Sequence, residues 1–257
     1  MKASELFDLT GKVAVITGGA GSIGMAYGRA LGEAGAKVVL ADVDAAAATQ
    51  AASALTADGF EAIGVAVDVR DLASAQAMAA AAVEAFGGID ILVNNAAIMR
   101  DLPPYGLSNM PVDEWDRVID VNLRGPLLCT QAVLPSMLQR GGGRIINGLS
   151  AGAFGAGGIY GISKYALHGL TANLASELGP QGINVNAIAP GLVAAESGYV
   201  SLAKDSPIRA ALEAGIPGKK SGPPEDLVGT LLLLCSSAGD WINGQSISVD
   251  GGWVMRL

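Results

Sequence analysis

Residues 13–24 read VAVITGGAGSIG, and this stretch decides the fold of the chain. The β-branched, apolar run from Val13 to Thr17 is typical of a buried strand. Glycine-rich residues follow it directly, and a helical pattern then continues from about Met25 to Ala34. A glycine turn between a strand and a helix suits phosphate, because backbone N–H groups and the helix N-terminus point at the anion. The stretch therefore predicts a dinucleotide-binding unit.

An acidic residue ends the next expected strand, which spans 37–41. Asp42 lies some twenty positions after the glycine turn. A carboxylate at this place accepts a hydrogen bond from a ribose 2′-hydroxyl and repels a 2′-phosphate. The sequence therefore predicts NAD rather than NADP as the cofactor.

Strands and helices alternate along the rest of the chain. Asp44 and Asp71 are expected helix N-caps, and Gly87-Gly88 ends the second of these helices. The remaining strands are expected at 62–67, 89–93, 144–149, 183–189 and 245–249. Helices are expected at 45–56, 71–86, 112–139, 159–178 and 225–236, with a break near Asn122 and Pro126 in the third.

Continuous apolar strands separated by helices predict an α/β fold. We expect a single-domain Rossmann fold over residues 1–257, with a doubly wound seven-stranded parallel sheet and helices on both faces. Ligands of such sheets bind at the carboxyl ends of the strands. The residues expected at that edge are Gly18 to Gly24, Asp42, Asp68, Asn94, Ser150 and Pro190-Gly191.

Composition excludes several classes of partner. The formal net charge of −8 and the pI of about 4.6 disfavour nucleic acid and anionic membrane surfaces. Cys129 and Cys235 lie in apolar segments as expected core residues, and His168 has no second ligand candidate, so we expect no metal site. With no apolar leader and no run of 18 apolar residues, the sequence predicts a soluble, cytoplasmic protein.

The stretch SAGAFGAGGIYGISK at 150–164 carries the candidate chemistry. On a helix, Tyr160 and Lys164 would share one face, because residues four apart are neighbours. A nearby cation favours the phenolate, which makes a tyrosine a usable acid or base near neutrality. Such a pair alone is typical of surface neighbours. Its place after the fifth expected strand, downstream of the glycine turn and Asp42, favours a proton-transfer pair beside a nicotinamide.

With these residues placed, the sequence resembles the short-chain dehydrogenase/reductase family from about Leu9 to Asp250. The resemblance rests on segments in a specific order and spacing: TGGAGSIG at 17–24, Asp42, Asp68-Val69, NNAA at 94–97, Val121-Asn122, Ser150, YGISK at 160–164, NVNAIAPG at 184–191, IPGKKSGPPEDL at 216–227 and GQSISVDGG at 244–252.

The resemblance implies a catalytic tetrad. Tyr160 would exchange a proton with the substrate oxygen, and Lys164 would lower the pKa of the tyrosine and bond the nicotinamide ribose. Ser150 would hold the same substrate oxygen. Asn122 would hold a water that links Lys164 to solvent. Ser163 is a rival serine, but we expect it to face away if Tyr160 and Lys164 face the site.

The resemblance also implies the cofactor contacts. It places the adenine near Asp68 and Val69, although helix-capping or turn formation is a rival role for Asp68. It runs the backbone of Asn94 and Ala96 along the cofactor and brings Val193 to the carboxamide. The full expected set is Gly18, Gly21, Ser22, Ile23, Gly24, Asp42, Asp68, Val69, Asn94, Ala96, Tyr160, Lys164, Pro190, Gly191 and Val193.

Four features depart from the family pattern. Ser22 replaces the second glycine of the turn, and Ala97 replaces the glycine of the usual NNAG. Ala195 replaces a threonine that would help to hold the carboxamide. Ser150 also precedes Tyr160 by only ten residues, a few fewer than is common in the family.

These observations predict an NAD-dependent oxidoreductase that interconverts a secondary alcohol and a ketone. A 3-oxoacyl-thioester reductase and a non-catalytic NAD-binding sensor are the alternatives. The segments expected to line the substrate pocket, 98–110 and 192–216, favour a small, neutral, moderately hydrophobic substrate. The 192–216 segment is the expected lid. The resemblance implies a homotetramer in which helices 112–139 and 159–178 pack between subunits.

Overall fold

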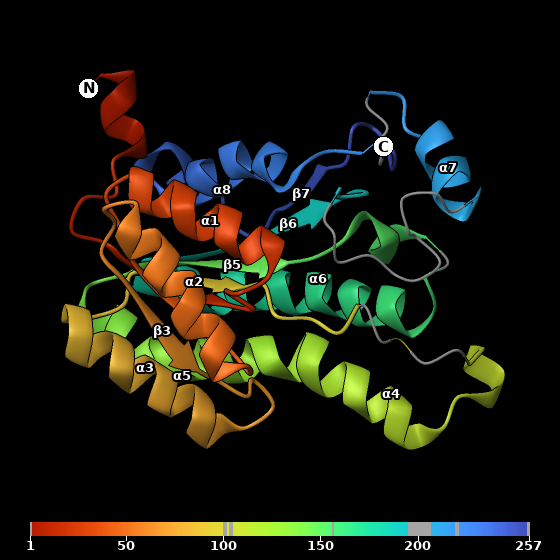
Figure 1. Ribbon diagram of the computed structural model, residues 1–257, viewed down its shortest axis with the longest axis horizontal. Helices are drawn as coiled ribbons and strands as arrows, with labels where there is room; N and C mark the ends of the chain where they lie inside the picture. Colours follow the sequence, from red (N-terminus) through yellow and green to blue (C-terminus); the bar gives the residue numbers. More distant parts are fainter. Residues whose placement is uncertain are drawn as a thin grey trace.

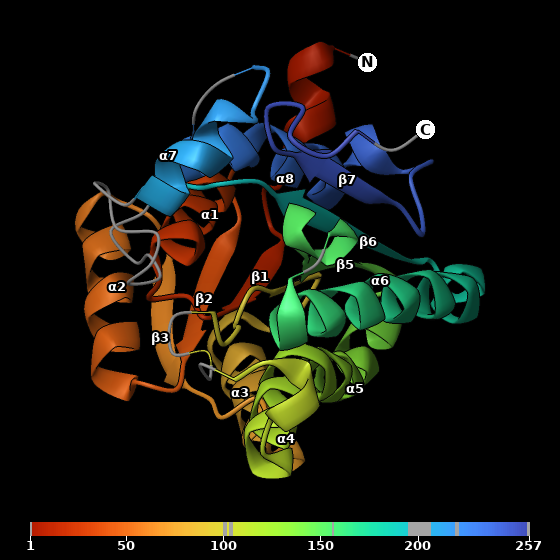
Figure 2. The ribbon, with the colours of Figure 1, turned by 90° about the vertical axis from the view of Figure 1, so that its right-hand side faces the viewer.

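The computed structural model describes residues 2–99, 102, 105–155, 157–194, 207–218 and 221–255. Its strands form one parallel sheet in the order β3-β2-β1-β4-β5-β6-β7 (Figures 1 and 2), which confirms the predicted doubly wound α/β fold. The strands are β1 (Val13–Thr17), β2 (Lys37–Asp42), β3 (Ala62–Ala66), β4 (Ile91–Asn94), β5 (Gly143–Gly148), β6 (Ile183–Pro190) and β7 (Ser246–Val249). The strand order reverses between β1 and β4, where such folds bind their ligands.

Helices cover both faces of the sheet. One core packs beneath α1 (Ser22–Glu33), α2 (Ala45–Ala57) and α8 (Val228–Cys235), and the other beneath α3 (Leu72–Phe86), α5 (Gly125–Gln139) and α6 (Gly158–Leu178). Alternate residues of β1 divide between them, since Ala14 and Ile16 face the first core and Val13 and Val15 the second. Figure 1 shows α4 (Val112–Ile119) and α7 (Pro207–Ala214) extending beyond the carboxyl edge of the sheet.

Short 3₁₀ turns connect these elements, and local signals in the sequence fix several helix ends. The turns lie at Ala3–Phe7, Leu107–Asn109, Ala151–Phe154 (η4), Gly179–Gln181, Pro224–Leu227 and Ser237–Gly239. The predicted caps are confirmed: Asp44 accepts from the N–H groups of Ala46 and Ala47 at 3.0 Å, and Asp71 accepts from Ala73. Gly87 ends α3 with φ of 84°.

The expected break in helix 112–139 is a widened turn instead. Residues Asp120–Arg124 form a π-helical turn, η3, in which the N–H of Gly125 bonds the carbonyl five residues back. Proline has no N–H, so Pro126 cannot give Asn122 the ordinary bond from four residues ahead. Gly125 also packs closely on Val69, because a Cβ there would lie 2.8 Å from Cγ2 of that valine. The helix therefore continues past Asn122 without the ordinary bond from residue 126 to its carbonyl.

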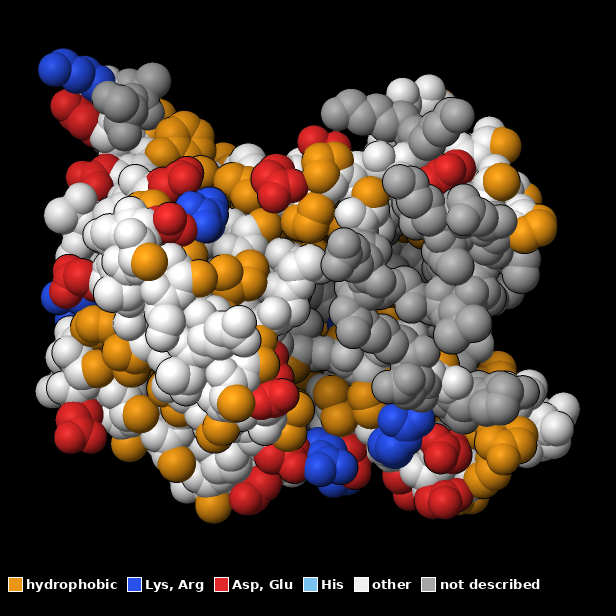
Figure 3. Space-filling view, viewed as in Figure 1, with side chains coloured by type: hydrophobic (Ala, Val, Ile, Leu, Met, Phe, Trp, Pro, Cys, Tyr) orange, Lys and Arg blue, Asp and Glu red, His pale blue; other side chains and the backbone are white. Residues whose placement is uncertain are grey.

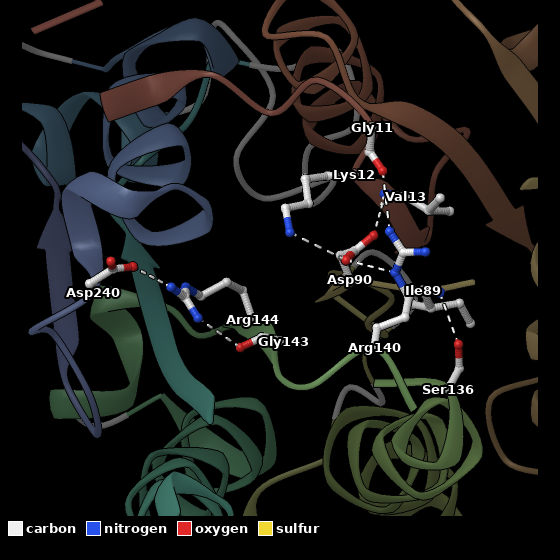
Figure 4. A network of polar contacts seen from close by, with 10 residues as sticks. All are labelled: Gly11, Lys12, Val13, Ile89, Asp90, Ser136, Arg140, Gly143, Arg144 and Asp240. Atoms are coloured by element: carbon white, nitrogen blue, oxygen red, sulfur yellow. Dashed lines mark hydrogen bonds and ion pairs between the residues drawn. The ribbon is translucent and has the colours of Figure 1, made fainter. Parts of the chain in front are cut away.

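A buried carboxylate ties together the opposite, amino edge of the sheet (Figure 4). Asp90, which is 6% exposed, accepts from the N–H of Val13 at 2.9 Å and from Nε of Arg140 at 2.8 Å. Lys12 adds an ion pair at 3.5 Å, and Arg144 pairs separately with the exposed Asp240. These contacts join β1 to the segments around β4 and β5, far along the strands from their carboxyl ends.

Both cysteines are buried, as the sequence predicts, and burial raises the pKa of each thiol to about 12.

Across the described parts of the chain, no helix is long and apolar enough to cross a membrane. Within the same residues, no three His, Cys, Asp or Glu side chains group as metal ligands would. On the face drawn in Figure 3, charged side chains of both signs lie scattered over the described surface.

Candidate active site

The glycine turn after β1 is closed against the end of β4. Gly18 has φ of +62°, and a Cβ on it would lie 2.9 Å from the Cα of Ala96. A Cβ on Gly24 would lie 2.4 Å from the carbonyl oxygen of Gly18. Side chains are thus excluded where α1 begins, and the backbone of Ser22 and Ile23 forms the first turn of that helix. This cradle fits a pyrophosphate at a helix N-terminus.

Two residues that the sequence interpretation did not single out hold this turn. Asn95 donates from Nδ2 to the carbonyls of Thr17 and Gly18 at 3.2 and 3.0 Å. The hydroxyl of Thr17 accepts from the N–H groups of Asn95 and Ala96, both at 3.2 Å. The repeated asparagine at 94–95 was visible in the sequence, but which of the two faces the turn depends on the strand register.

Asp42 lies beside the glycine turn, at the end of β2. One carboxylate oxygen accepts from the backbone N–H of Ala20 at 3.2 Å, and the other accepts from the backbone N–H of Asp44 at the same distance. Its contacts are therefore backbone N–H groups, and the residue that follows it is the apolar Val43. The carboxylate is placed where the adenosine ribose of a dinucleotide lies in this type of fold.

The carboxylate of Asp68 is held by a neighbouring cation. Arg70 donates to it from Nε at 2.9 Å and from a terminal nitrogen at 2.6 Å, and these bonds lower the pKa of the Asp68 carboxyl. The N–H of Arg70 also donates to Asp68, so the expected turn role is present. The sequence interpretation missed Arg70, because its bond to Asp68 forms in the turn after β3, where no helix or strand period applies. Val69 is buried against Gly125.

Asn94 has its side chain inside the sheet rather than at its surface. Nδ2 donates to Oδ1 of Asn147 at 2.9 Å, and Asn147 in turn donates to the hydroxyl of Thr171 at 3.0 Å. All three side chains are buried. The side chain of Asn94 therefore binds β4 to β5 and α6, and only its backbone and that of Ala96 can follow a ligand along the edge.

Lys164 and Tyr160 do share one face of α6. Nζ of Lys164 lies 5.8 Å from the centre of the Tyr160 ring. Nζ also donates to the carbonyl of Gly148, at the carboxyl end of β5, at 2.6 Å. Lys164 is 2% exposed, and this burial lowers its pKa to about 8. The ammonium is therefore fixed at the sheet edge and exchanges its proton close to neutral pH.

Ser150 follows β5 and begins the short connection to α6. Its Oγ accepts from the N–H of Gly152 at 3.1 Å, which leaves the hydroxyl proton for another acceptor. The connection is compact because Cβ atoms on Gly157 and Gly161 would lie 2.9 and 3.0 Å from the carbonyl oxygen of Gly152. Glycine at both places lets the Ser150 loop rest directly on the first turn of α6.

Aromatic packing fixes the far end of that connection. Phe154 packs edge-on against Tyr165 and His168 of α6, with ring centres 6.2 and 5.8 Å away. Nδ1 of His168 lies 2.8 Å from the hydroxyl of Ser246 in β7. The short run between Ser150 and Tyr160 is therefore packed on its own helix, and His168 joins that helix to β7 through Ser246.

Asn122 lies fully buried in η3 and joins three segments. Its Oδ1 accepts from the N–H of Ile98 at 2.7 Å, while Nδ2 donates to the carbonyl of Ile98 and to Oγ of Ser163, both at 3.1 Å. Ser163 does not simply face away from the site, as the sequence suggested, because its hydroxyl is buried against Asn122.

The segment after β6 presents backbone groups to the same edge. Gly191 lies against Asp250, where a Cβ would be 2.7 Å from Cα of the aspartate. Val193 forms a parallel bridge with Gly222. In this bridge the N–H of Gly222 donates to the carbonyl of Leu192, and the carbonyl of Gly222 accepts from the N–H of Ala194. The N–H and C=O of Val193 are not used in that bridge and point to its other side. Pro190 ends β6 beside Gly191, and a cavity of about 60 Å³ lies next to this segment.

Several residues of the expected substrate pocket lie outside the described part of the chain. They are Arg100, Ala195, Gly198, Tyr199, Val200, Leu202 and Lys204. Of the expected lid, the structure describes 192–194 and 207–216, and the latter includes α7. The structure thus brings Ser150, Tyr160, Lys164 and Asn122 together around the start of α6, and the glycine turn and Asp42 lie at the same edge of the sheet.

Comparison with known proteins identifies the family. The family described as "Enoyl-(Acyl carrier protein) reductase" matches residues 18–254. An uncharacterized oxidoreductase of Mycobacterium tuberculosis is 45% identical over 245 residues, covering 95% of this chain and 98% of the relative. The chain belongs to the short-chain dehydrogenase/reductase family.

Two further members of the short-chain dehydrogenase/reductase family carry named activities. Galactitol 2-dehydrogenase of Agrobacterium fabrum is 41% identical over 256 residues, covering 95% of this chain and 98% of that one. A gluconate 5-dehydrogenase from Burkholderia cenocepacia, solved in complex with NADP and tartrate, superposes with a TM-score of 0.92 at 34% identity and covers 100% of both chains. Both relatives are named as dehydrogenases, and this chain shares their family and, with the second, its fold.

Proposed function

We propose that this protein is an NAD-dependent dehydrogenase that interconverts a secondary alcohol and a ketone, with Tyr160 as general acid and base. One observation carries the proposal. A buried lysine, bonded to the end of β5, holds its ammonium 5.8 Å from the ring of Tyr160, at the edge that also carries the glycine turn and Asp42. A phenol next to a desolvated cation is a suitable proton acceptor.

Each residue of this group has a separate task in alcohol oxidation. The phenolate of Tyr160 takes the hydroxyl proton of the substrate, and Lys164 stabilises that phenolate. Ser150 donates to the same substrate oxygen, where charge develops. A bound nicotinamide dinucleotide supplies the hydride acceptor. The widened turn at Asn122 suits a water between Lys164 and solvent, through which the proton leaves.

The expected contacts of the dinucleotide follow the carboxyl edge of the sheet. Gly18, Gly21, Ser22, Ile23 and Gly24 hold the pyrophosphate. The adenosine lies near Asp42, Asp68 and Val69, the backbone of Asn94 and Ala96 follows the middle of the cofactor, and Pro190, Gly191 and Val193 meet the carboxamide.

Preference for NAD over NADP rests on Asp42. Its carboxylate points at the backbone of Ala20 within the turn and would repel a 2′-phosphate there. The gluconate 5-dehydrogenase carries NADP in its solved structure. Titrations of this protein with NADH and NADPH, followed by cofactor fluorescence, test the preference. We expect tight NADH binding in the wild type and a gain in NADPH binding in Asp42→Asn. Tight NADPH binding in the wild type would contradict the assignment.

The substrate class divides into two candidates. The sequence favours a small, neutral, moderately hydrophobic alcohol. Polyols are the second candidate, because one relative is named galactitol 2-dehydrogenase and another, from Mycolicibacterium smegmatis, D-threitol dehydrogenase. A panel of both classes with NAD, read by absorbance of the reduced cofactor, decides between them. No turnover of any secondary alcohol would overturn the proposed function.

Two other functions have weaker support. A 3-oxoacyl-thioester reductase agrees with the description of the matched family, but Asp42 disfavours the NADPH that we expect such an enzyme to use. A non-catalytic NAD sensor would not need Tyr160, Lys164 and Ser150 around one helix start. Turnover of a 3-oxoacyl thioester with NADPH, but of no free alcohol, would favour the reductase.

We also propose a homotetramer in the cytoplasm. Four apolar side chains are exposed on the helices expected to pack between subunits: Val112, Leu138, Ile162 and Tyr165. Trp241 is 100% exposed and Met255 lies exposed near the end of the chain, which is consistent with a further contact. Light scattering on the purified protein tests the proposed oligomeric state.

A further inference from the structure

We propose that Ser163, between Tyr160 and Lys164, is a positioning residue that ties Asn122 to the Tyr160 turn of α6. The inference rests on the proposed function, since it concerns how that group of residues is held. Neither the motif nor the relatives assign a task to this serine. It differs from the residue before it, because Ile162 is exposed at the surface whereas Ser163 is 0% exposed.

The hydroxyl of Ser163 has two partners that require a definite orientation. It donates to the carbonyl of Tyr160 at 2.7 Å and accepts from Nδ2 of Asn122 at 3.1 Å. A hydroxyl has one proton, so donation to the carbonyl leaves only lone pairs for the amide. Ser163 therefore links the backbone of Tyr160 directly to the side chain of Asn122.

The amide of Asn122 is fixed in the same way. The N–H of Ile98 can only donate, so the atom that it contacts at 2.7 Å must be the amide oxygen. The amide nitrogen then donates its two protons to the carbonyl of Ile98 and to Oγ of Ser163. With all three of these bonds made, the side chain of Asn122 acts as a tie between segments, and its contribution to proton transfer must come from its backbone.

Removal of the Ser163 hydroxyl oxygen should disturb the proton-transfer residues. Without Oγ of Ser163, a buried amide proton of Asn122 loses its acceptor, and the π-helical turn is no longer held to α6. The backbone of that turn would then shift relative to Lys164 and Tyr160. The glycine turn and Asp42 have no contact with this link, so cofactor binding should change little. The expected effect is therefore on the proton-transfer step.

The test measures kcat and KM for NAD from pH 6 to 10 in wild type, Ser163→Ala and Ser163→Cys. We expect both variants to lower kcat ~5-fold, the worth of one ordinary hydrogen bond. We expect an altered pH profile of kcat and a KM for NAD within about twofold of wild type. Cysteine has the shape of serine and is only slightly larger, but it bonds weakly, so a packing role alone would leave Ser163→Cys largely active. Ser236→Ala is the matched control, because Ser236 is buried and its Oγ has no hydrogen-bond partner.

A double-mutant cycle with Asn122→Ala decides whether Ser163 acts through Asn122. We expect Ser163→Ala to have little further effect on kcat in the Asn122→Ala background. The same ~5-fold loss in both backgrounds, or an unchanged pH profile in Ser163→Ala and Ser163→Cys, would overturn this inference while wild-type turnover still supports the proposed function. A wild type that turns over no alcohol overturns the proposed function and this inference with it.

Discussion

Lys164 donates a 2.6 Å hydrogen bond from its buried Nζ to the carbonyl of Gly148, which fixes the ammonium two residues before Ser150. The lysine comes from α6 and the serine from the connection that follows β5, so this one bond sets the helix against the strand end. Burial lowers the pKa of Lys164 to about 8. The group that is expected to tune Tyr160 therefore changes its own charge near physiological pH.

The first prediction concerns stability and pH. An unfolded lysine titrates near 10.4, so between pH 8 and that value the unfolded chain holds one more proton than the folded one. The free energy of unfolding should therefore rise with pH in this window, by about 3 kcal/mol in total from this group. Denaturant unfolding without cofactor should show the free energy of unfolding of the wild type rising relative to that of Lys164→Met from pH 8 to 10. A constant difference between the two proteins over this range would contradict the lowered pKa of Lys164.

The second prediction concerns the packed glycine at the start of α6. A Cβ on Gly161 would lie 3.0 Å from the carbonyl oxygen of Gly152, the residue whose N–H holds Ser150. Gly161→Ala should displace the serine and lower kcat about tenfold, because small misplacements of catalytic groups are costly. Gly169→Ala on the same helix is the control, since its Cβ would meet nothing within 4 Å. Equal kcat values for the two variants would refute the role of this packing.

The third prediction concerns the π-helical turn. Alanine at position 126 would restore an N–H four residues after Asn122, and the turn could then close into a regular helix. Pro126→Ala should lower kcat severalfold while the free energy of unfolding stays equal or rises. Pro135→Ala removes an exposed proline from the same helix, α5, and should leave kcat unchanged. Full activity in Pro126→Ala would show that the widened turn at Asn122 is not needed.

The fourth prediction concerns the amino edge of the sheet. Asp90 is buried and bonds Val13, Arg140 and Lys12, so Asp90→Ala leaves a partly buried guanidinium without its carboxylate. We expect a loss of about 3 kcal/mol in the free energy of unfolding. Asp240→Ala should cost less than about 1 kcal/mol, because that carboxylate is mostly exposed. Chemical denaturation measures both, and a similar loss in the two variants would contradict this ranking.

The sequence was enough to predict the sheet, its strands and most of the helices, because apolar runs, caps such as Asp44 and the glycine turn are local signals. It did not predict α7, which lies in the segment expected only as a lid. It was also enough to place Tyr160 and Lys164 on one helix face, since their spacing determines that. Element ends were less certain: α1 begins at Ser22 rather than near Met25, because Gly21 takes the N-cap position.

The interactions that hold the candidate site depend on contacts between distant segments. Ser163 meets Asn122 across 41 positions, and Asn95 meets Gly18 across 77. The periodic pattern of a single helix or strand cannot predict which distant residue its side chains will contact. The sequence did not predict the role of Arg70 for a different reason. Its bond to Asp68 forms in the turn after β3, outside any regular element. The substrate pocket is the least determined part in both the sequence and the described structure.

Replacement of Tyr160 by phenylalanine tests the central claim most directly. The substitution removes only the phenolic oxygen, so the ring and its packing on α6 remain. NADH binding, followed by fluorescence, should stay within about twofold of wild type, whereas oxidation of the best alcohol of the panel should fall by at least ~10²-fold. Substantial turnover in Tyr160→Phe, with cofactor binding intact, would contradict the assignment of Tyr160 as the proton-transfer residue.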